Sequence, residues 1–171
     1  MRRYVIAGNW KMNKTVAEAT ETAAELRRLV SQIRDCDIII APTYTALWPV
    51  AQKLGDSNIS VCAQEIHFEK SGAFTGAISA DMAHEAGCTY TLVGHSERRQ
   101  IFGETLASSR QRMQAAFDAG LTPILCIGET LEEREAGRTM QVVGEQLDAA
   151  IEGFDLATLE NMIVAYEPVW A

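Results

Sequence analysis

The sequence predicts an α/β protein in which parallel β-strands and helices alternate along the chain. Two observations support this prediction. Short runs rich in valine and isoleucine recur, and each is apolar throughout instead of at every second residue, which is typical of strands buried on both faces of a parallel sheet. Helical patterns lie between these runs, so that one strand and one helix repeat every roughly 25–40 residues, the size of a βαβ unit.

Six strands are predicted, and in chain order they span residues 4–10, 37–42, 59–64, 90–95, 121–128 and 162–167. The segment 15–33 is predicted to be a helix, because its apolar residues recur at spacings of three and four and form one stripe. Thr15 and Glu18 form a capping box at its start, and TLEE at 130–133 repeats that signature. No linker or low-complexity run divides the pattern, so residues 1–171 are expected to form a single domain.

Two architectures share this pattern, an open doubly wound sheet and a closed barrel of eight strands. The length of the repeat does not distinguish them. A doubly wound sheet that binds a dinucleotide would carry G-x-G-x-x-G after its first strand, whereas this chain has AGNWKMNKT there. The sequence therefore disfavours a dinucleotide-binding sheet.

The charge and the cysteines narrow the class of protein further. The formal net charge of −8 argues against a nucleic acid or an anionic membrane as the main partner. The four cysteines form no C-x-x-C pair, which favours reduced thiols in a cytosolic protein over disulfides or zinc ligands. The first apolar run is too short for a signal peptide, and no stretch approaches the roughly 18 apolar residues of a membrane span. We therefore expect a cytoplasmic protein that binds neither nucleic acid nor membrane.

Polar side chains follow most of the predicted strands. Active sites of both architectures lie at the carboxyl ends of the strands. The polar residues at these ends are Asn9, Lys11, Gln64, Glu65, His95, Ser96, Glu97, Glu129 and Glu167. An amide, an ammonium group, an imidazole and carboxylates at one edge of a sheet form a set that can move a proton beside a carbonyl group. Taken singly, Asn9 is more often a turn residue and Lys11 a solvated one.

His95 is the candidate hydrogen-bond donor. Gly94 lets the chain bend before it, and Ser96 begins SERRQIFG, which predicts a short helix capped by that serine. A histidine at a helix N-terminus is held neutral by the helix dipole. The alternatives are a structural histidine or a metal ligand, but His67 and His84 show no ligand spacing relative to it, so we expect no metal.

Glu167 is the candidate general base. It follows an apolar run, and its neighbours in AYEPVWA include no basic residue. A carboxylate without a neutralising partner at the end of a strand is suited to accept a proton. The structural alternative is an exposed glutamate in a turn, at which Pro168 ends the strand.

Four motifs occur in the order GNWKMN (8–13), VGHSERR (93–99), CIGET (126–130) and AYEPVWA (165–171). In this order and spacing they resemble the triosephosphate isomerase family, and the likeness runs along the whole chain. The resemblance implies a (β/α)8 TIM barrel, of which about six βα units are present in these residues. It also implies an isomerase of glycolysis and gluconeogenesis that interconverts dihydroxyacetone phosphate and D-glyceraldehyde 3-phosphate without a cofactor or a metal.

The resemblance assigns a role to each candidate. Glu167 takes the proton from the carbon beside the carbonyl, and neutral His95 polarises the carbonyl oxygen. Lys11 supplies positive charge to the enediolate and the phosphate, and Asn9 donates near the same oxygens. Glu97 lies behind these residues.

The resemblance further implies a homodimer formed through the loop 64–79, with Thr75 near the active site of the neighbouring subunit. It places strands seven and eight and the phosphate-binding loops outside residues 1–171, so we expect little activity from this fragment alone. Two alternatives stay open. One is a non-catalytic assembly module, and the other is a different phosphosugar enzyme, such as an aldolase or an epimerase, which would need a Schiff-base lysine or paired metal ligands.

Overall fold

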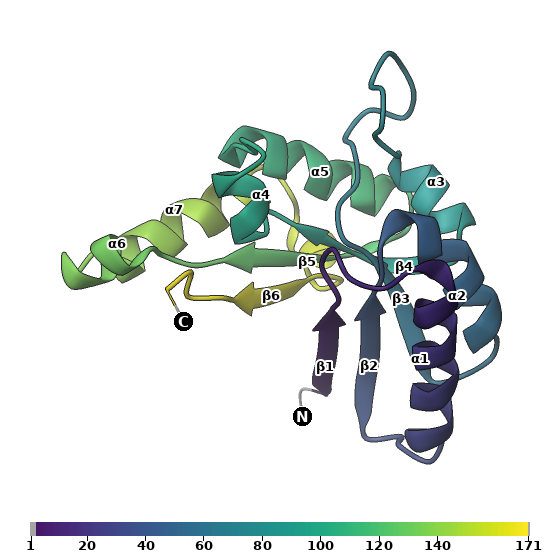
Figure 1. Ribbon diagram of the computed structural model, residues 1–171. Helices are drawn as coiled ribbons and strands as arrows, with labels where there is room; N and C mark the ends of the chain where they lie inside the picture. Colours follow the sequence, from purple (N-terminus) through teal and green to yellow (C-terminus); the bar gives the residue numbers. More distant parts are fainter. Residues whose placement is uncertain (1–2, 171) are drawn as a thin grey trace.

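The computed structural model describes residues 3–170, which form one curled sheet of six parallel strands with helices on its outer side (Figure 1). The elements are β1 (Tyr4–Asn9), α1 (Val16–Leu29), β2 (Cys36–Ala41), the 3-10 helix η1 (Tyr44–Ala46), α2 (Leu47–Leu54), β3 (Ile59–Ala63), α3 (Ala80–Glu85), β4 (Cys88–Val93), α4 (Ser96–Gln100), α5 (Leu106–Asp118), β5 (Thr122–Ile127), α6 (Leu131–Glu135), α7 (Thr139–Ile151), α8 (Leu156–Leu159) and β6 (Ile163–Tyr166). Met1, Arg2 and Ala171, which belong to the predicted domain and to the closing motif, lie outside the described residues.

All six predicted strands are confirmed, and five of them have the predicted bounds to within one residue. The fourth differs. The prediction of 90–95 was wrong at both ends, because β4 runs from Cys88 to Val93. Gly94 has a φ of 68° and turns the chain out of the sheet, so His95 lies beyond the end of the strand.

The first helix is shorter than predicted. Thr15 and Glu18 do form a capping box, but α1 ends at Leu29 and not at residue 33. The residues that follow form a turn, because the side-chain amide of Asn58 donates to the carbonyl oxygens of Val30 and Ile33 at 2.9 and 2.8 Å. A capping box also opens α6, as the sequence TLEE predicts.

The order of the strands distinguishes the two architectures. It is β1-β2-β3-β4-β5-β6, and every neighbouring pair is parallel. A doubly wound sheet reverses its strand order at a switch point, whereas a barrel keeps chain order throughout. The sheet also curls, so that β1 and β2 run upward in Figure 1 while β5 and β6 run toward the left. The fold is therefore a half-barrel of six parallel strands, of which the first five are each followed by a helix.

The two faces of the sheet bury different side chains. In β2, Ile38 and Ile40 pack outward in the cluster that includes α1 and α2, whereas Ile39 and Ala41 point inward. The inward cluster consists of Ile39, Ala41, Cys62, Leu92, Ile124 and Cys126. Burial on both faces explains why the strands are apolar throughout. The edge strands are less covered, and Ile6 and Val164 are exposed.

Candidate active site

The six strands bring the predicted polar residues to one rim of the half-barrel. Parallel strands in one sheet all end at the same edge, so the residues that follow them converge. A cavity of about 240 Å³ opens there, and Asn9, His95 and Glu167 line it together with inward-facing strand residues. A second cavity of about 300 Å³ adjoins it through Asn9 and His95, and Lys11 and Glu97 line that one.

His95 is held by the start of α4. Its side chain, not that of Ser96, caps the helix: the backbone N–H of Glu97 donates to Nδ1 at 3.2 Å. The prediction of Ser96 as the cap was wrong, because the turn at Gly94 places His95 in the capping position and Ser96 in the first turn. A nitrogen that accepts a hydrogen bond carries no proton, so the neutral ring has its proton on Nε2. Only 8% of the side chain is exposed.

Glu167 faces His95 across the rim. Its Oε1 lies 3.3 Å from His95 Nε2, and the hydroxyl of Ser96 donates to its Oε2 at 3.4 Å. Within residues 3–170, no lysine or arginine lies within ion-pair distance of this carboxylate. The structure thus joins the imidazole and the carboxylate that the sequence analysis pairs.

Lys11 sits in a strained turn after β1. Its φ is 52°, which is uncommon for a residue with a side chain and costs about 1–3 kcal/mol. Two side chains hold this turn: Asn9 Oδ1 accepts from the backbone N–H of Lys11 at 2.9 Å, and Gln64 donates to its carbonyl oxygen at 2.8 Å. Asn9 is therefore a turn residue as well as a residue of the cavity wall.

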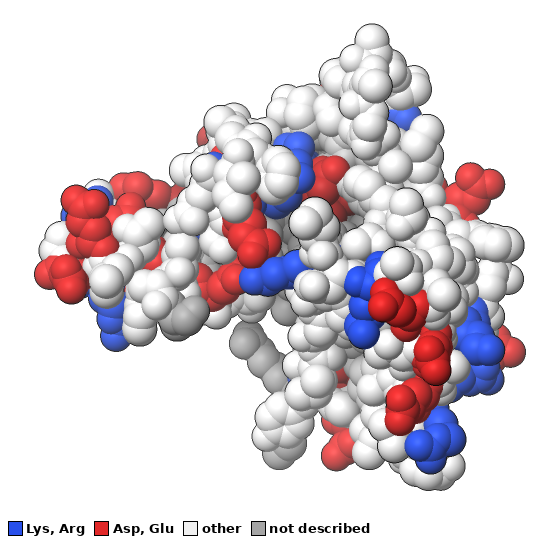
Figure 2. Space-filling view, in the orientation of Figure 1, with Lys and Arg blue, Asp and Glu red and all other residues white. Residues whose placement is uncertain are grey.

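The ammonium group of Lys11 binds Glu97. Nζ lies 2.9 Å from Glu97 Oε1, and this hydrogen bond raises the pKa of Lys11 above its usual value. Glu97 Oε2 lies 3.6 Å from His95 Nδ1. Glu97 thus contacts both Lys11 and His95. Figure 2 shows basic and acidic side chains side by side around the middle of this face.

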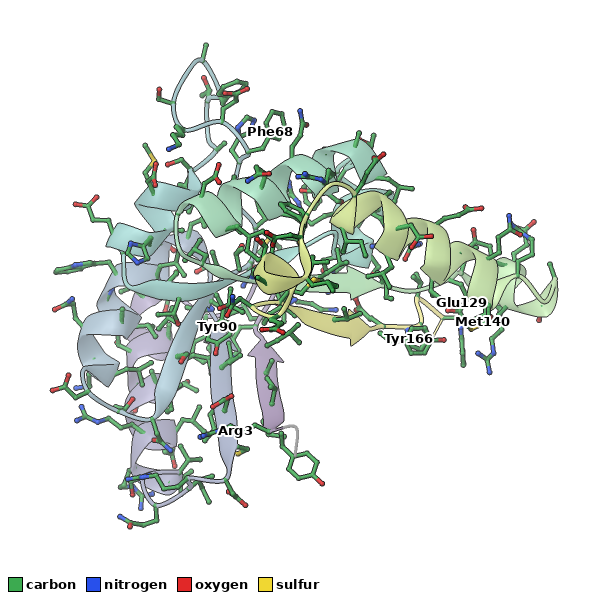
Figure 3. All side chains as sticks on the ribbon, turned by 180° about the vertical axis from the view of Figure 1, so that it is seen from behind. Arg3, Phe68, Tyr90, Glu129, Met140 and Tyr166 are labelled. Carbon is green, nitrogen blue, oxygen red and sulfur yellow. The ribbon has the colours of Figure 1, made fainter. Side chains whose placement is uncertain are left out.

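Glu129 follows β5, and its side chain binds Tyr166 and Trp170 on either side of Glu167. Its carboxylate is fully buried and accepts hydrogen bonds from Tyr166 at 3.0 Å, Trp170 at 3.2 Å and Arg134 at 3.3 Å. Glu129 and Tyr166 lie side by side at the strand ends (Figure 3). Burial opposes the charged form, but the hydrogen bonds outweigh it and lower the pKa of Glu129 to about 2.

Acid is expected to weaken the fold through Glu129. Because its folded pKa of about 2 lies below the ordinary 4.5, the carboxylate stabilises the fold fully above pH 4.5, and this contribution is lost as the pH falls from 4.5 toward 2. Urea unfolding at several pH values would measure it. The Glu129→Gln chain should show a smaller drop in unfolding free energy across this window, and equal drops in both chains would contradict the expectation.

A buried ion-pair cluster joins α4 to the start of the loop 64–79. Glu104 binds Arg98 Nε at 2.7 Å and Arg112 Nη2 at 3.3 Å, and the side chain of Glu104 is only 4% exposed. Glu65 lies 3.8–3.9 Å from both guanidinium groups and accepts from Tyr44 Oη. Burial, together with the charge of Glu65, raises the pKa of Tyr44.

The sequence pattern did not lead us to predict this cluster, although the position of Arg112 indicates it. It lies on the buried stripe of α5 with Ser109, Met113 and Ala116. A charge on an apolar stripe requires a buried partner.

Thr75 is the one predicted site residue that lies away from the rim. It is exposed on the loop that projects beyond α3 in Figure 1 and lines neither cavity. Among the residues that the structure describes, no three histidine, cysteine, aspartate or glutamate side chains are grouped to hold a metal ion.

Comparisons with known proteins agree along the whole chain. A family model described as triosephosphate isomerase matches residues 4–171. The triosephosphate isomerases of Syntrophotalea carbinolica and Clostridium beijerinckii are 52% and 46% identical to it over 171 residues, which is 100% of this chain and 68% of each relative. The crystal structure of triosephosphate isomerase from Bartonella henselae matches 99% of this chain and 70% of that one, with a TM-score of 0.89 and 41% identity. The structural match confirms the predicted fold class.

Proposed function

Because this chain belongs to the triosephosphate isomerase family, we propose that its rim site interconverts dihydroxyacetone phosphate and D-glyceraldehyde 3-phosphate. The observation that carries the proposal is the 3.3 Å separation of Glu167 Oε1 and His95 Nε2, with His95 Nδ1 already occupied by a backbone N–H. A base and a neutral donor that lie side by side on the wall of one cavity suit proton transfer beside a carbonyl group. None of the six strands carries a lysine that could form the Schiff base of an aldolase.

In the proposed reaction, Glu167 removes a proton from the carbon beside the carbonyl group. The electron pair moves onto the carbonyl oxygen, which takes the proton of His95 Nε2, and Nε2 regains a proton from the neighbouring hydroxyl group, whose oxygen becomes the new carbonyl oxygen. Lys11 and Asn9, fixed at the cavity wall, stabilise the developing negative charge without reorganising when it forms. Glu167 then returns the proton to the neighbouring carbon.

Glu97 supports two of these groups in the proposed reaction. Its carboxylate holds the ammonium group of Lys11 at 2.9 Å, and its backbone N–H donates to Nδ1 of His95 and so favours the tautomer with the proton on Nε2. We therefore propose that Glu97 positions both residues, in agreement with the role that the family resemblance implies.

A coupled assay that follows the interconversion of the two triose phosphates tests the proposal. The blank is the Glu167→Gln chain, which keeps the size of the side chain and loses its basicity. We expect turnover that the blank lacks, because a glutamine side chain cannot accept the proton. Equal rates for the chain and the blank would refute the proposed activity.

We also propose that two copies associate through the loop 64–79. Ile66 is fully buried in its own barrel, but the tip carries exposed Phe74, which packs on His67 with ring centroids 4.0 Å apart. No charged residue occurs in the sequence 71–79, and the tip of the projection in Figure 2 is uncharged. The family resemblance places Thr75 of one copy near the active site of the other, and the cavity lined by Lys11 and Glu97 opens at that site.

Sedimentation velocity measures this association. The unsubstituted chain is expected to have the mass of a dimer, and Phe74→Asp is expected to shift it to a monomer, because a carboxylate would be buried at the contact. Met140→Asp, at an exposed position on α7, is the control and should leave the mass unchanged. A monomeric mass for the unsubstituted chain would contradict the proposal.

We further propose a cytoplasmic protein that binds neither nucleic acid nor membranes. Its net charge is −8, and its four cysteines are unpaired thiols. Within the described part of the chain, the helices are too short or too polar to span a bilayer.

A further inference from the structure

The backbone of Glu167 rests on Gly128. The β5–β6 pairing continues past both strands, with Glu167 N–H donating to Ile127 O at 2.7 Å and Val169 N–H to Glu129 O at 3.0 Å. Gly128 lies between these two bonds, and it is buried. A Cβ at position 128 would overlap the carbonyl oxygen of Glu167, so only glycine allows this approach.

Gln146 on α7 holds Gly128 from the outer side of the sheet. The backbone N–H of Gly128 donates to Gln146 Oε1 at 2.8 Å, and Gln146 Nε2 donates to the carbonyl oxygen of Gly128 at 3.1 Å. In a parallel ladder, the residue between two bonded ones directs its own N–H and C=O to the opposite side. On that side the neighbouring strand β4 ends at Val93, and the carboxamide of Gln146 binds both groups instead.

Arg99 connects the same point to the segment that carries His95. Its guanidinium donates to the carbonyl oxygens of Cys126 at 3.0 Å and Gly128 at 3.4 Å, and also to that of Gly94, directly before His95. Side chains, and not a continued ladder, therefore join the ends of β4 and β5.

We propose that Gln146 is a positioning residue for Glu167. By holding both backbone groups of Gly128, it fixes the surface on which the Glu167 backbone rests, and thereby the distance from Glu167 Oε1 to His95 Nε2. Gln146 lines neither cavity of the rim, so it acts through Gly128 and not on the substrate. This inference rests on the proposed function of Glu167 and extends it to a residue behind the sheet.

The kinetic test compares Gln146→Leu with two variants on the same helix. Gln146→Leu keeps the volume and loses both hydrogen bonds, so kcat is expected to fall about 10-fold or more while KM stays within about 2-fold, since small displacements of a reacting group are costly. Gln141→Leu removes an exposed glutamine that bonds only Glu145. Leu147→Ala weakens the α7 packing without touching Gly128. Both controls should retain kcat.

A second variant separates positioning from folding. Gln146→Glu keeps the acceptor for the N–H of Gly128 and loses the donor to its carbonyl oxygen, so its kcat should lie between those of the unsubstituted chain and Gln146→Leu. The positioning role would be overturned if kcat simply followed the thermal stability of the variants. In that case Leu147→Ala would be as slow as Gln146→Leu wherever the two are equally stable.

Amide NMR gives a readout that does not depend on turnover. Gln146→Leu should speed hydrogen exchange at Gly128 and shift the amide signal of Glu167, whereas Leu147→Ala should not do so selectively. Unchanged Gly128 and Glu167 signals would refute the inference even if the chain is inactive. Conversely, equal rates for the unsubstituted chain and Glu167→Gln would refute the proposed function alone, because the amide signals would still decide the role of Gln146.

Discussion

Replacing Glu167 with aspartate is expected to lower kcat by about 100-fold. The substitution withdraws the carboxylate by about one methylene from its position 3.3 Å from His95 Nε2, and a base this far back no longer reaches the carbon that it must deprotonate. The charge is retained, so substrate affinity should change much less than turnover. Initial rates in the coupled assay over a range of substrate concentrations separate the two effects.

The matched control is Glu160→Asp. Glu160 is exposed on the segment that leads into β6, and it takes no part in the rim. Its shortening should leave kcat unchanged. If Glu167→Asp retained its rate to within a few-fold, Glu167 would not be the base.

Glu104→Leu is expected to cost about 3–5 kcal/mol of unfolding free energy, the usual loss when one partner of a buried ion pair is removed. Glu104 neutralises both Arg98 and Arg112, and the side chains of these arginines are only 27% and 9% exposed. Without it, Glu65 alone would face two guanidinium groups at 3.8–3.9 Å. Urea unfolding followed by circular dichroism measures the loss.

Glu21→Leu serves as the comparison, because Glu21 is exposed on α1. That variant should lose at most about 0.5 kcal/mol, as surface substitutions usually do. Similar losses in the two variants would show that the buried cluster does not stabilise the fold.

Much of the fold follows from the sequence for a simple physical reason. Strands covered on both faces must be apolar throughout, and such runs are visible without any tertiary information. The converging site residues also follow, because parallel strands end at one edge. Asn9, His95 and Glu167 line one cavity, and Lys11 and Glu97 line the next, as their places after the strands predict.

The features that we predicted wrongly or did not predict depend on backbone turns and on contacts between segments that are distant in the sequence. His95 caps α4 because Gly94 adopts a positive φ, which moves the helix start by one residue from the serine that propensity favours. Nothing near Gln146 indicates that its carboxamide meets Gly128, eighteen residues earlier. This contact depends on how α7 packs against β5, and the residues next to Gln146 in the sequence do not determine that packing.

The chain-order arrangement of the strands has a consequence for how the protein acquires its structure. Each strand pairs with the one synthesised just before it, so no strand has to wait for a segment from the far end of the chain. A nascent chain leaving the ribosome can therefore add each unit to those already formed, and β1 and β2 can pair long before Glu167 is translated.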